Sequence, residues 1–178
     1  MKKSVIIGLL TGFALAALFI YIKSYKVAVD PIDIIASDVI KKDSEYKLVF
    51  FGYAGCYHFC DPRLRQIDPI YKELKKSLDL KMLFVEISAE ATDIDSQNFV
   101  KDVNSEFEAV NPDPDNLKVL QKQFKNVYVR KMPEGEYLHS GFLYLLKKYG
   151  QKYYILKIYT EFTNSKAVIA DIKKLSAL

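Results

Sequence analysis

The chain has 178 residues and a formal net charge of +4, with 26 lysines and arginines against 22 acidic residues. Its length suffices for one ordinary domain and no more. The lysines are scattered among acidic residues instead of forming a basic stripe with aromatic residues, so the composition argues against a nucleic-acid partner.

The first predicted element is an uncharged segment, Ser4 to Ile22, which lies between Met1-Lys2-Lys3 and Lys23. As a helix it would extend roughly 28 Å, close to the hydrocarbon thickness of a bilayer. Ala14-Leu15-Ala16 resembles a cleavage site, but apolar residues continue beyond it. We therefore predict a retained membrane anchor over residues 1–23 in preference to a cleaved signal peptide. The segment contains no cysteine, which excludes a lipoprotein anchor.

A single N-terminal span usually places the domain behind it outside the cytoplasm, here on the periplasmic side of a bacterial inner membrane. Gly8, Gly12 and Ala16 form a stripe of small residues that could pair two such helices into a homodimer. Small residues are also common in membrane helices, so the stripe alone leaves the dimer open.

Residues 24–45 are interrupted by Pro31 and predict a tether with a short lead-in element around Ile32 to Ile40. Residues 46–178 alternate between strand and helix patterns, beginning with an apolar run from Lys47 to Tyr53 that is typical of a central strand buried on both faces. The elements predicted next are a helix from Pro62 to Ser77 with Asp61 as N-cap, a strand from Lys81 to Ile87, a helix from Asp95 to Phe107 capped by Asp95, a loop over Asn111 to Asp115, a helix from Leu117 to Asn126, a short strand at Val127 to Val129, strands over Leu138 to Leu146 and Tyr153 to Tyr159, and a helix opening at Thr163. This order predicts an α/β domain of thioredoxin-like fold: a parallel βαβ unit, then a hairpin and a closing helix.

Cys56 and Cys60 are the only cysteines in the chain, and they lie where the first core strand gives way to the first core helix. Unpaired N–H groups and the helix dipole at such a position lower thiol pKa values and favour the thiolate. A pair spaced in this way can hold a soft metal ion or cycle between dithiol and disulfide. A structural disulfide is a further alternative, although a bridge that closes so small a loop adds little stability.

Two thiolates usually need a third ligand to hold a metal ion, and the chain has two histidines, His58 and His139. In a thioredoxin-like plan the segment that contains His139 lies beside the turn that bears the cysteines, so its imidazole could reach them. Two thiolates and one imidazole suit Cu(I) and can also hold Cu(II), whereas a closed zinc site needs a fourth ligand. His139 could instead be an ordinary strand-edge histidine. His58, between the two cysteines, is expected to point away from a site that both face.

The alternative function is that of a thiol-disulfide oxidoreductase acting on the cysteines of a client protein. Cys56 would then be the nucleophile and Cys60 the resolving thiol, and His139 would be dispensable or would only tune a pKa. A peroxidase that uses one cysteine is disfavoured because the Thr-x-x-Cys setting is missing. A pure interaction module, in which the cysteines have no chemical role, is the weakest alternative.

The sequence resembles the Sco/SenC family of membrane-anchored, copper-binding, thioredoxin-like proteins that assemble cytochrome c oxidase. The resemblance covers roughly Leu48 to Leu178 and rests on the segment Phe51-Gly52-Tyr53-x-x-Cys56-x-x-x-Cys60-x-Pro62 together with His139-Ser140-x-Phe142-x-Tyr144-Leu145. It implies copper ligands at Cys56, Cys60 and His139. It also implies delivery of copper to a client cuproprotein, the copper centre of cytochrome c oxidase subunit II.

The chain departs from the family pattern at several positions. Tyr57-His58-Phe59 stands between the cysteines, where the family usually has a proline after the first. Leu138 replaces the acidic residue that commonly precedes His-Ser, which removes one candidate for orienting the imidazole. The Asp-rich motif after the second strand is reduced to Ser88–Asp93, and the family's N-terminal hairpin is short or missing between Asp30 and Glu45. These departures bear on the client more than on the chemistry of the site.

Overall fold

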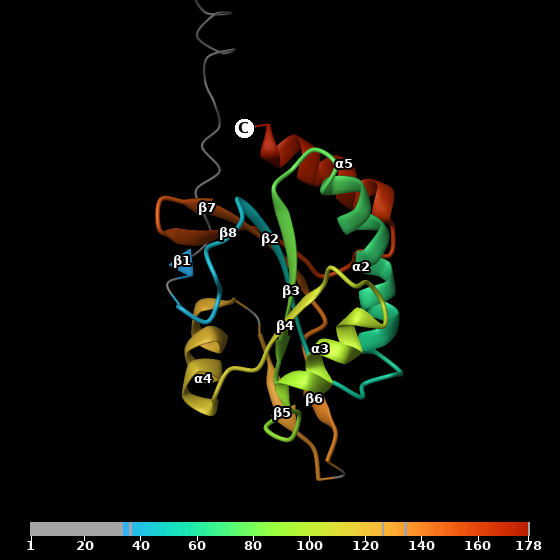
Figure 1. The fold of residues 1–178 in the computed structure, drawn as a ribbon, viewed down its shortest axis with the longest axis vertical. Helices are drawn as coiled ribbons and strands as arrows, with labels where there is room; N and C mark the ends of the chain where they lie inside the picture. Colours follow the sequence, from blue (N-terminus) through green and yellow to red (C-terminus); the bar gives the residue numbers. More distant parts are fainter. Residues whose placement is uncertain (1–33, 36, 126, 134, 178) are drawn as a thin grey trace, which may run out of the picture. The chain divides into compact units, whose positions relative to one another are not determined.

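The structure, a computed structural model, describes residues 34–35, 37–125, 127–133 and 135–177 (Figure 1). The predicted anchor over residues 1–23, its small-residue stripe and the first part of the tether lie outside these residues. Among the described helices, none is both long enough and apolar enough to cross a membrane.

The domain is built on a six-stranded mixed sheet with the strand order β1-β8-β7-β2-β3-β4, and a separate two-stranded hairpin pairs β5 with β6. The strands are β1 (Ile34–Ile35), β2 (Tyr46–Gly52), β3 (Leu80–Glu86), β4 (Glu108–Val110), β5 (Val129–Lys131), β6 (Tyr137–His139), β7 (Leu143–Tyr149) and β8 (Lys152–Tyr159), and the helices are α2 (Cys60–Leu74), α3 (Asp93–Lys101), α4 (Pro114–Gln123) and α5 (Ser165–Ser176). The pairs β2–β3 and β3–β4 are parallel, whereas β2–β7, β7–β8 and β1–β8 are antiparallel. This is the predicted thioredoxin-like plan, with β2 in the middle of the sheet.

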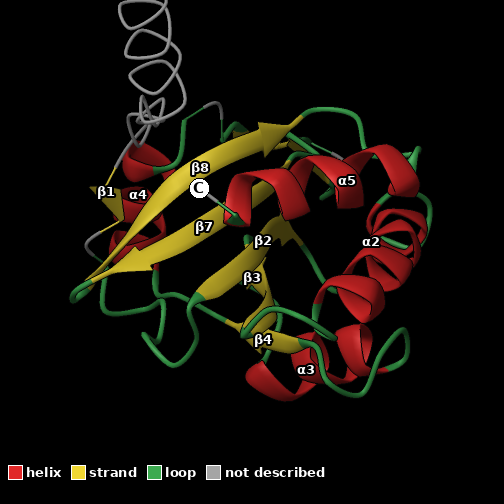
Figure 2. Cartoon of the chain, turned by 90° about the horizontal axis from the view of Figure 1, so that it is seen from above, coloured by secondary structure: helices red, strands yellow, loops and turns green. Residues whose placement is uncertain are grey.

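Both faces of the sheet are covered, as the continuous apolar sequence of the central strand predicts. All seven residues of β2 are buried. Successive side chains of a strand point to opposite faces, so Leu48 and Phe50 pack with α2, α3 and α5, while Val49 and Phe51 pack with α4 and the lead-in segment. Figure 2 shows the two layers, with α4 on the opposite side of the sheet from α2, α3 and α5.

The predicted strand from Leu138 to Leu146 is wrong, because the chain leaves one sheet and enters another within it. His139 ends β6 in the small hairpin, and Leu143 begins β7 in the main sheet. The predicted helix from Asp95 to Phe107 ends at Lys101, and β4 follows at Glu108 as an edge strand that the sequence analysis missed.

Three helix starts also differ from the prediction. Helix α2 begins at Cys60, so Asp61 lies in its first turn and pairs with Arg65 instead of capping it. Helix α3 is capped by Thr92 through a capping box, in which Asp95 is the reciprocal partner. Helix α4 begins at Pro114 after the cap Asp113, inside the predicted loop.

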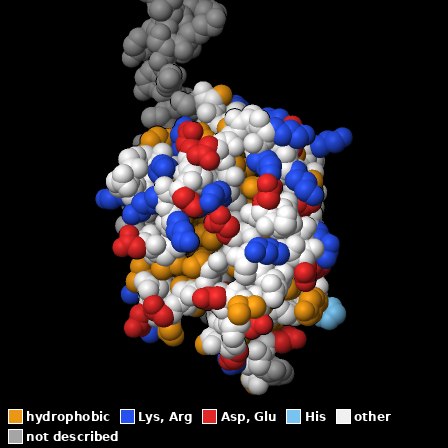
Figure 3. Space-filling view, in the orientation of Figure 1, with side chains coloured by type: hydrophobic (Ala, Val, Ile, Leu, Met, Phe, Trp, Pro, Cys, Tyr) orange, Lys and Arg blue, Asp and Glu red, His pale blue; other side chains and the backbone are white. Residues whose placement is uncertain are grey.

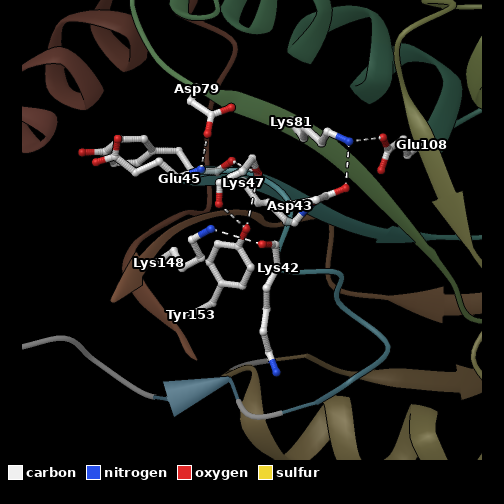
Figure 4. Close-up of polar contacts among 11 residues, drawn as sticks. Lys42, Asp43, Glu45, Lys47, Asp79, Lys81, Glu108, Lys148 and Tyr153 are labelled. Carbon is white, nitrogen blue, oxygen red and sulfur yellow. Dashed lines mark hydrogen bonds and ion pairs between the residues drawn. The ribbon is translucent and has the colours of Figure 1, made fainter. Parts of the chain in front are cut away.

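An ion-pair network that includes one buried lysine ties the lead-in segment to the sheet (Figure 4). Lys47 of β2 is only 1% exposed, and its Nζ lies 2.6 Å from Asp43 Oδ1. Lys81 of β3 reaches Asp43 at 2.7 Å and Glu108 at 2.8 Å. On the outside, acidic and basic side chains are interspersed on the face seen in Figure 3.

Candidate metal centre

The loop that carries the cysteines is a tight turn between β2 and α2. Cys56 N–H donates to the Tyr53 carbonyl at 3.2 Å, and Gly55 adopts a positive φ of 89°, which glycine adopts without strain. The N–H of Cys60 donates to the Cys56 carbonyl at 3.0 Å. The two cysteines therefore lie one helical turn apart at the N-terminus of α2.

The close approach of α2 to the central strand depends on Gly52. A Cβ at this position would lie 2.9 Å from Cys60 Sγ and 2.8 Å from the Phe84 ring. Both neighbours are fully buried and cannot move aside. A glycine inside a strand is a signal for close approach that the sequence analysis did not use.

The histidine comes from the β5–β6 hairpin, in which His139 pairs with Val129. Ser140 closes the hairpin beside it, because its N–H donates to the Tyr128 carbonyl at 3.0 Å and its Oγ accepts from the Tyr128 N–H at 3.2 Å. The next residue, Gly141, leaves room for Phe59, since a Cβ there would lie 2.5 Å from the Phe59 ring. The His-Ser-Gly segment thus sets the imidazole beside the cysteine loop.

The structure brings the three predicted ligands together. Cys56 Sγ, Cys60 Sγ and a ring nitrogen of His139 all lie within 4.8 Å of one another. Cys60 Sγ lies 3.3 Å from His139 Nε2, and the Cys60 N–H donates to Cys56 Sγ at 3.4 Å. His58 is exposed and is not part of this group, as expected.

The geometry fits a three-coordinate metal ion. Ligand atoms about 2.0–2.3 Å from a trigonal metal are separated by about 3.5–4 Å, so small side-chain movements would suffice here. Across the described part of the chain, no other cluster of three or more histidine, cysteine or acidic side chains has this geometry. Two thiols and one imidazole are a soft donor set of the kind that selects copper.

The imidazole is held by contacts that do not require the missing acidic residue. His139 Nδ1–H donates to the Ser140 carbonyl at 3.3 Å, and this contact turns Nε2 towards the thiols. Phe50, Tyr53 and Phe59 surround the ring in edge-on contacts, with centroid separations of 6.3, 6.1 and 5.4 Å. Leu138, at the position of the family's acid, is 53% exposed. A backbone carbonyl and three aromatic rings therefore orient the histidine.

The two thiols have very different proton affinities. A hydrogen bond from the Cys60 thiol, helped by His139, the Cys60 N–H and Tyr53, lowers the pKa of Cys56 to about 4. The same hydrogen bond, together with burial and the negative charge of Cys56, raises the pKa of Cys60. The expectation that the helix terminus makes both cysteines thiolates is therefore wrong for Cys60 without a metal. Burial and the hydrogen bond to Cys56 raise the pKa of Tyr53 to about 12.

The site opens to solvent through a cavity of about 240 Å³ between the cysteine loop and β6. Cys56 lines this cavity, whereas Cys60 is fully buried behind it. The mouth is apolar, because Tyr57 is 69% exposed and Leu138 is 53% exposed. A partner can therefore reach His139 and the 8% exposed Cys56 only through this cavity, and it cannot reach Cys60, which is 0% exposed.

The family model described as SCO1/SenC matches residues 39–177, which include the whole site. The chain belongs to the SCO1/SenC family. No curated protein matches the sequence significantly.

Solved structures of this family have the same fold as the chain. Arabidopsis thaliana ScoI with copper bound is 17% identical, with a TM-score of 0.67 over 76% of this chain and 86% of that chain. Yeast Sco1 with copper bound is 19% identical, with a TM-score of 0.62 over 73% and 75%. BsSco, described as a Sco-family cytochrome c oxidase assembly protein with a disulfide switch, is 22% identical, with a TM-score of 0.56 over 76% and 82%.

Proposed function

We propose that this SCO1/SenC protein binds copper through Cys56, Cys60 and His139 and passes it to a client cuproprotein. The observation that carries the proposal is the convergence of three ligand atoms within 4.8 Å, with two of the ligand residues, Cys56 and His139, on the wall of an open cavity. Ligand exchange with a client needs an accessible site of low coordination number, and two thiolates with one imidazole provide it. Copper-bound relatives of the same fold support this choice of metal.

The client that the family suggests is the copper centre of cytochrome c oxidase subunit II. We further propose that residues 1–23 anchor the protein, that residues 24–45 tether and lead into the domain, and that the domain of residues 46–178 faces the periplasm. This location would bring the site to the side of the membrane where the client's copper centre is assembled.

The test is an anaerobic Cu(I) titration of the purified, reduced full-length protein against a competing chelator. We expect one Cu(I) per chain and a loss of affinity of at least about tenfold in His139→Ala, because a ligand is removed. Cys60→Ala should abolish tight binding, since a single thiolate remains. His58→Ala is the matched control, because this exposed histidine sits in the cysteine loop but outside the ligand group.

Tight binding that survived both His139→Ala and Cys60→Ala unchanged would contradict the copper site. So would the absence of tight Cu(I) binding by the unmodified protein.

A second candidate function is thiol-disulfide exchange with a client, and the asymmetry of the two thiols favours it. A low-pKa Cys56 on the cavity wall suits the nucleophile, and the buried, protonated Cys60 suits the resolving thiol. The disulfide switch described for BsSco is consistent with such chemistry. Reduction of a disulfide substrate at an unchanged rate in His139→Ala, without tight copper binding, would select this function.

A further inference from the structure

Two carboxylates in the segment from Glu86 to Ser96 contact the two parts of the candidate site, the cysteine loop and the β5–β6 hairpin. Neither carboxylate belongs to the ligand set. Glu86 ends β3, and Glu90 lies in the loop before α3. Glu86 contacts the cysteine loop, and Glu90 contacts the histidine hairpin.

Glu86 is a buried carboxylate, 1% exposed, with four hydrogen-bond donors around it. Its Oε2 accepts from the Ala54 N–H at 2.8 Å and from Ser96 Oγ at 2.9 Å. Its Oε1 accepts from the N–H groups of Ile87 at 3.1 Å and Ser88 at 2.9 Å. Within the described residues it forms no ion pair, so these donors alone compensate the burial of its charge.

The contact with Ala54 places Glu86 beside the start of the cysteine loop. Ala54 lies two residues before Cys56, and Glu86 pairs across the sheet with Gly52, against which Cys60 Sγ packs. The alternation of side chains places Glu86 on the same face as Phe84, which is the face covered by α2 and α3. Loss of the carboxylate would free the Ala54 amide and loosen the turn that sets the separation of Cys56 and Cys60.

Glu90 makes the corresponding contact with the hairpin. Its carboxylate pairs with Lys131 of β5, and its Oε2 accepts from Tyr137 Oη of β6 at 2.7 Å. Tyr137 lies two residues before His139 and packs against the Tyr53 ring at a centroid separation of 5.4 Å. Glu90 thus bridges the two strands of the hairpin from outside and fixes it to the β3–α3 connection.

We propose that Glu86 and Glu90 are positioning residues that act on different parts of the site: Glu86 sets the geometry of the two thiols, and Glu90 holds His139 against them. This inference rests on the proposed function only for its copper measurements. Because the two carboxylates act on different ligands, substitution of Glu86 and substitution of Glu90 should change different measured properties.

The role of Glu86 is tested by the thiol-disulfide equilibrium of Cys56 and Cys60, and this measurement needs no copper. In Glu86→Gln, the remaining side-chain oxygen can still accept hydrogen bonds, but the NH2 group that replaces the other carboxylate oxygen cannot, so two of the four donors lose their acceptor. We expect the pair to oxidise more readily, with the equilibrium constant for disulfide formation changed about tenfold, the size of one hydrogen bond to a charged group. Lys47→Met is the matched control, because it removes an equally buried charge from β2 without contacting the site.

The role of Glu90 is tested by the Cu(I) affinity of the Glu90→Ala variant. This variant should fold normally because Glu90 is exposed. We expect affinity to fall about tenfold, as for other groups that orient a metal-binding histidine, while the disulfide equilibrium stays as in the unmodified protein. The effect should disappear in a His139→Ala background, since the two residues act on one ligand. Glu106→Ala, which breaks an exposed pair with Lys75, is the control for loss of a surface ion pair.

A disulfide equilibrium that did not change in Glu86→Gln relative to Lys47→Met would overturn the proposed role of Glu86. The proposed role of Glu90 would be overturned if Glu90→Ala left the Cu(I) affinity unchanged, or if its effect persisted in the His139→Ala background. If the unmodified protein bound no copper, the proposed function would fail, and the disulfide measurement would still decide the role of Glu86.

Discussion

At the scale of single residues, the two cysteines show how one helical turn separates a reactive thiol from an inert one. Cys56 lines the cavity and its sulfur accepts hydrogen bonds. Cys60 is fully buried, and its thiol donates a hydrogen bond to Cys56. The chain sequence offers the same residue type at both positions. Their difference arises from burial and from the direction of one hydrogen bond.

This difference predicts the pH dependence of alkylation in the copper-free, reduced protein. Because the pKa of Cys56 is about 4, its thiolate persists well below the ordinary thiol range. Iodoacetamide should therefore modify Cys56 at a nearly constant rate from about pH 8 to pH 5, and more slowly as the pH falls through 4. Mass spectrometry of peptides after timed quenching measures the rate at each cysteine.

Cys60 is the internal control for this measurement and should remain unmodified over the same range. A rate at Cys56 that rose steeply between pH 7 and pH 9 would contradict the lowered pKa.

The lowered pKa of Cys56 also makes the stability of the folded state depend on pH. The unfolded chain holds the Cys56 proton up to the ordinary thiol range, so the folded state gains stability as the pH rises above about 4.

At the scale of elements, the lead-in segment is joined to the sheet by charge as well as by apolar packing. Ile35 and Ile40 are buried against the α4 face, and Asp43 accepts from the buried Lys47. Although its partial burial acts in the opposite direction, hydrogen bonds from Lys47 and Lys81 hold the pKa of Asp43 at about 2. The lead-in residues that the structure describes are therefore part of the folded domain.

Substitutions at the two ends of this pair should have unequal effects on stability. Asp43→Asn leaves the Lys47 ammonium buried without its counter-ion and should lower the free energy of unfolding by about 3 kcal/mol. Lys47→Met removes the buried charge and keeps the aliphatic volume, so it should cost about 1 kcal/mol or less. Urea denaturation of both variants at pH 7 measures the difference.

The pair can also be checked through pH and through the double variant. In the unmodified protein, the contribution of Asp43 is present above pH 3.8 and is lost as the pH falls through about 2. The double variant Asp43→Asn, Lys47→Met should be more stable than Asp43→Asn alone. Equal losses in both single variants would mean that the pair does not act through burial of the Lys47 charge.

Elements near the site were predicted less well than elements in the core. The pattern of β2 and β3 is set by burial on both faces, which leaves a continuous apolar run in the sequence. The run from Leu138 to Leu146 also contains many apolar residues, but His139-Ser140-Gly141 interrupts it where the chain crosses from the hairpin to the main sheet. The sequence analysis did not use this interruption, because apolar residues on both sides of it fit a single strand.

At the scale of the whole molecule, the predicted position of the domain outside the cytoplasm rests on the sequence of residues 1–23. The sequence predicts a retained span with the C-terminal domain outside the cytoplasm. A C-terminal alkaline phosphatase fusion, which is active only outside the cytoplasm, should therefore be active in bacterial cells. The fusion should remain with the membrane fraction after alkaline extraction.

Deletion of residues 1–23 is the control and should abolish the phosphatase signal. Recovery of a soluble, active fusion whose N-terminus begins just after Ala16 would identify a cleaved signal peptide instead. Activity of a cytoplasmic reporter at the same position would contradict the predicted orientation.

The sequence by itself determined the fold class, the family and the identity of the three candidate ligands. It could do so because a buried strand, an amphipathic helix and a pair of soft donors each leave a local pattern of residue types, and because the thioredoxin-like plan predicts which distant segment, the one containing His139, lies beside the cysteines. Only the tertiary structure decided which cysteine is acidic, how His139 is oriented without an acidic neighbour, and which carboxylates support the site. These properties depend on contacts between segments far apart in the chain, such as Glu86 with Ala54 and Glu90 with Tyr137, and no local pattern encodes them.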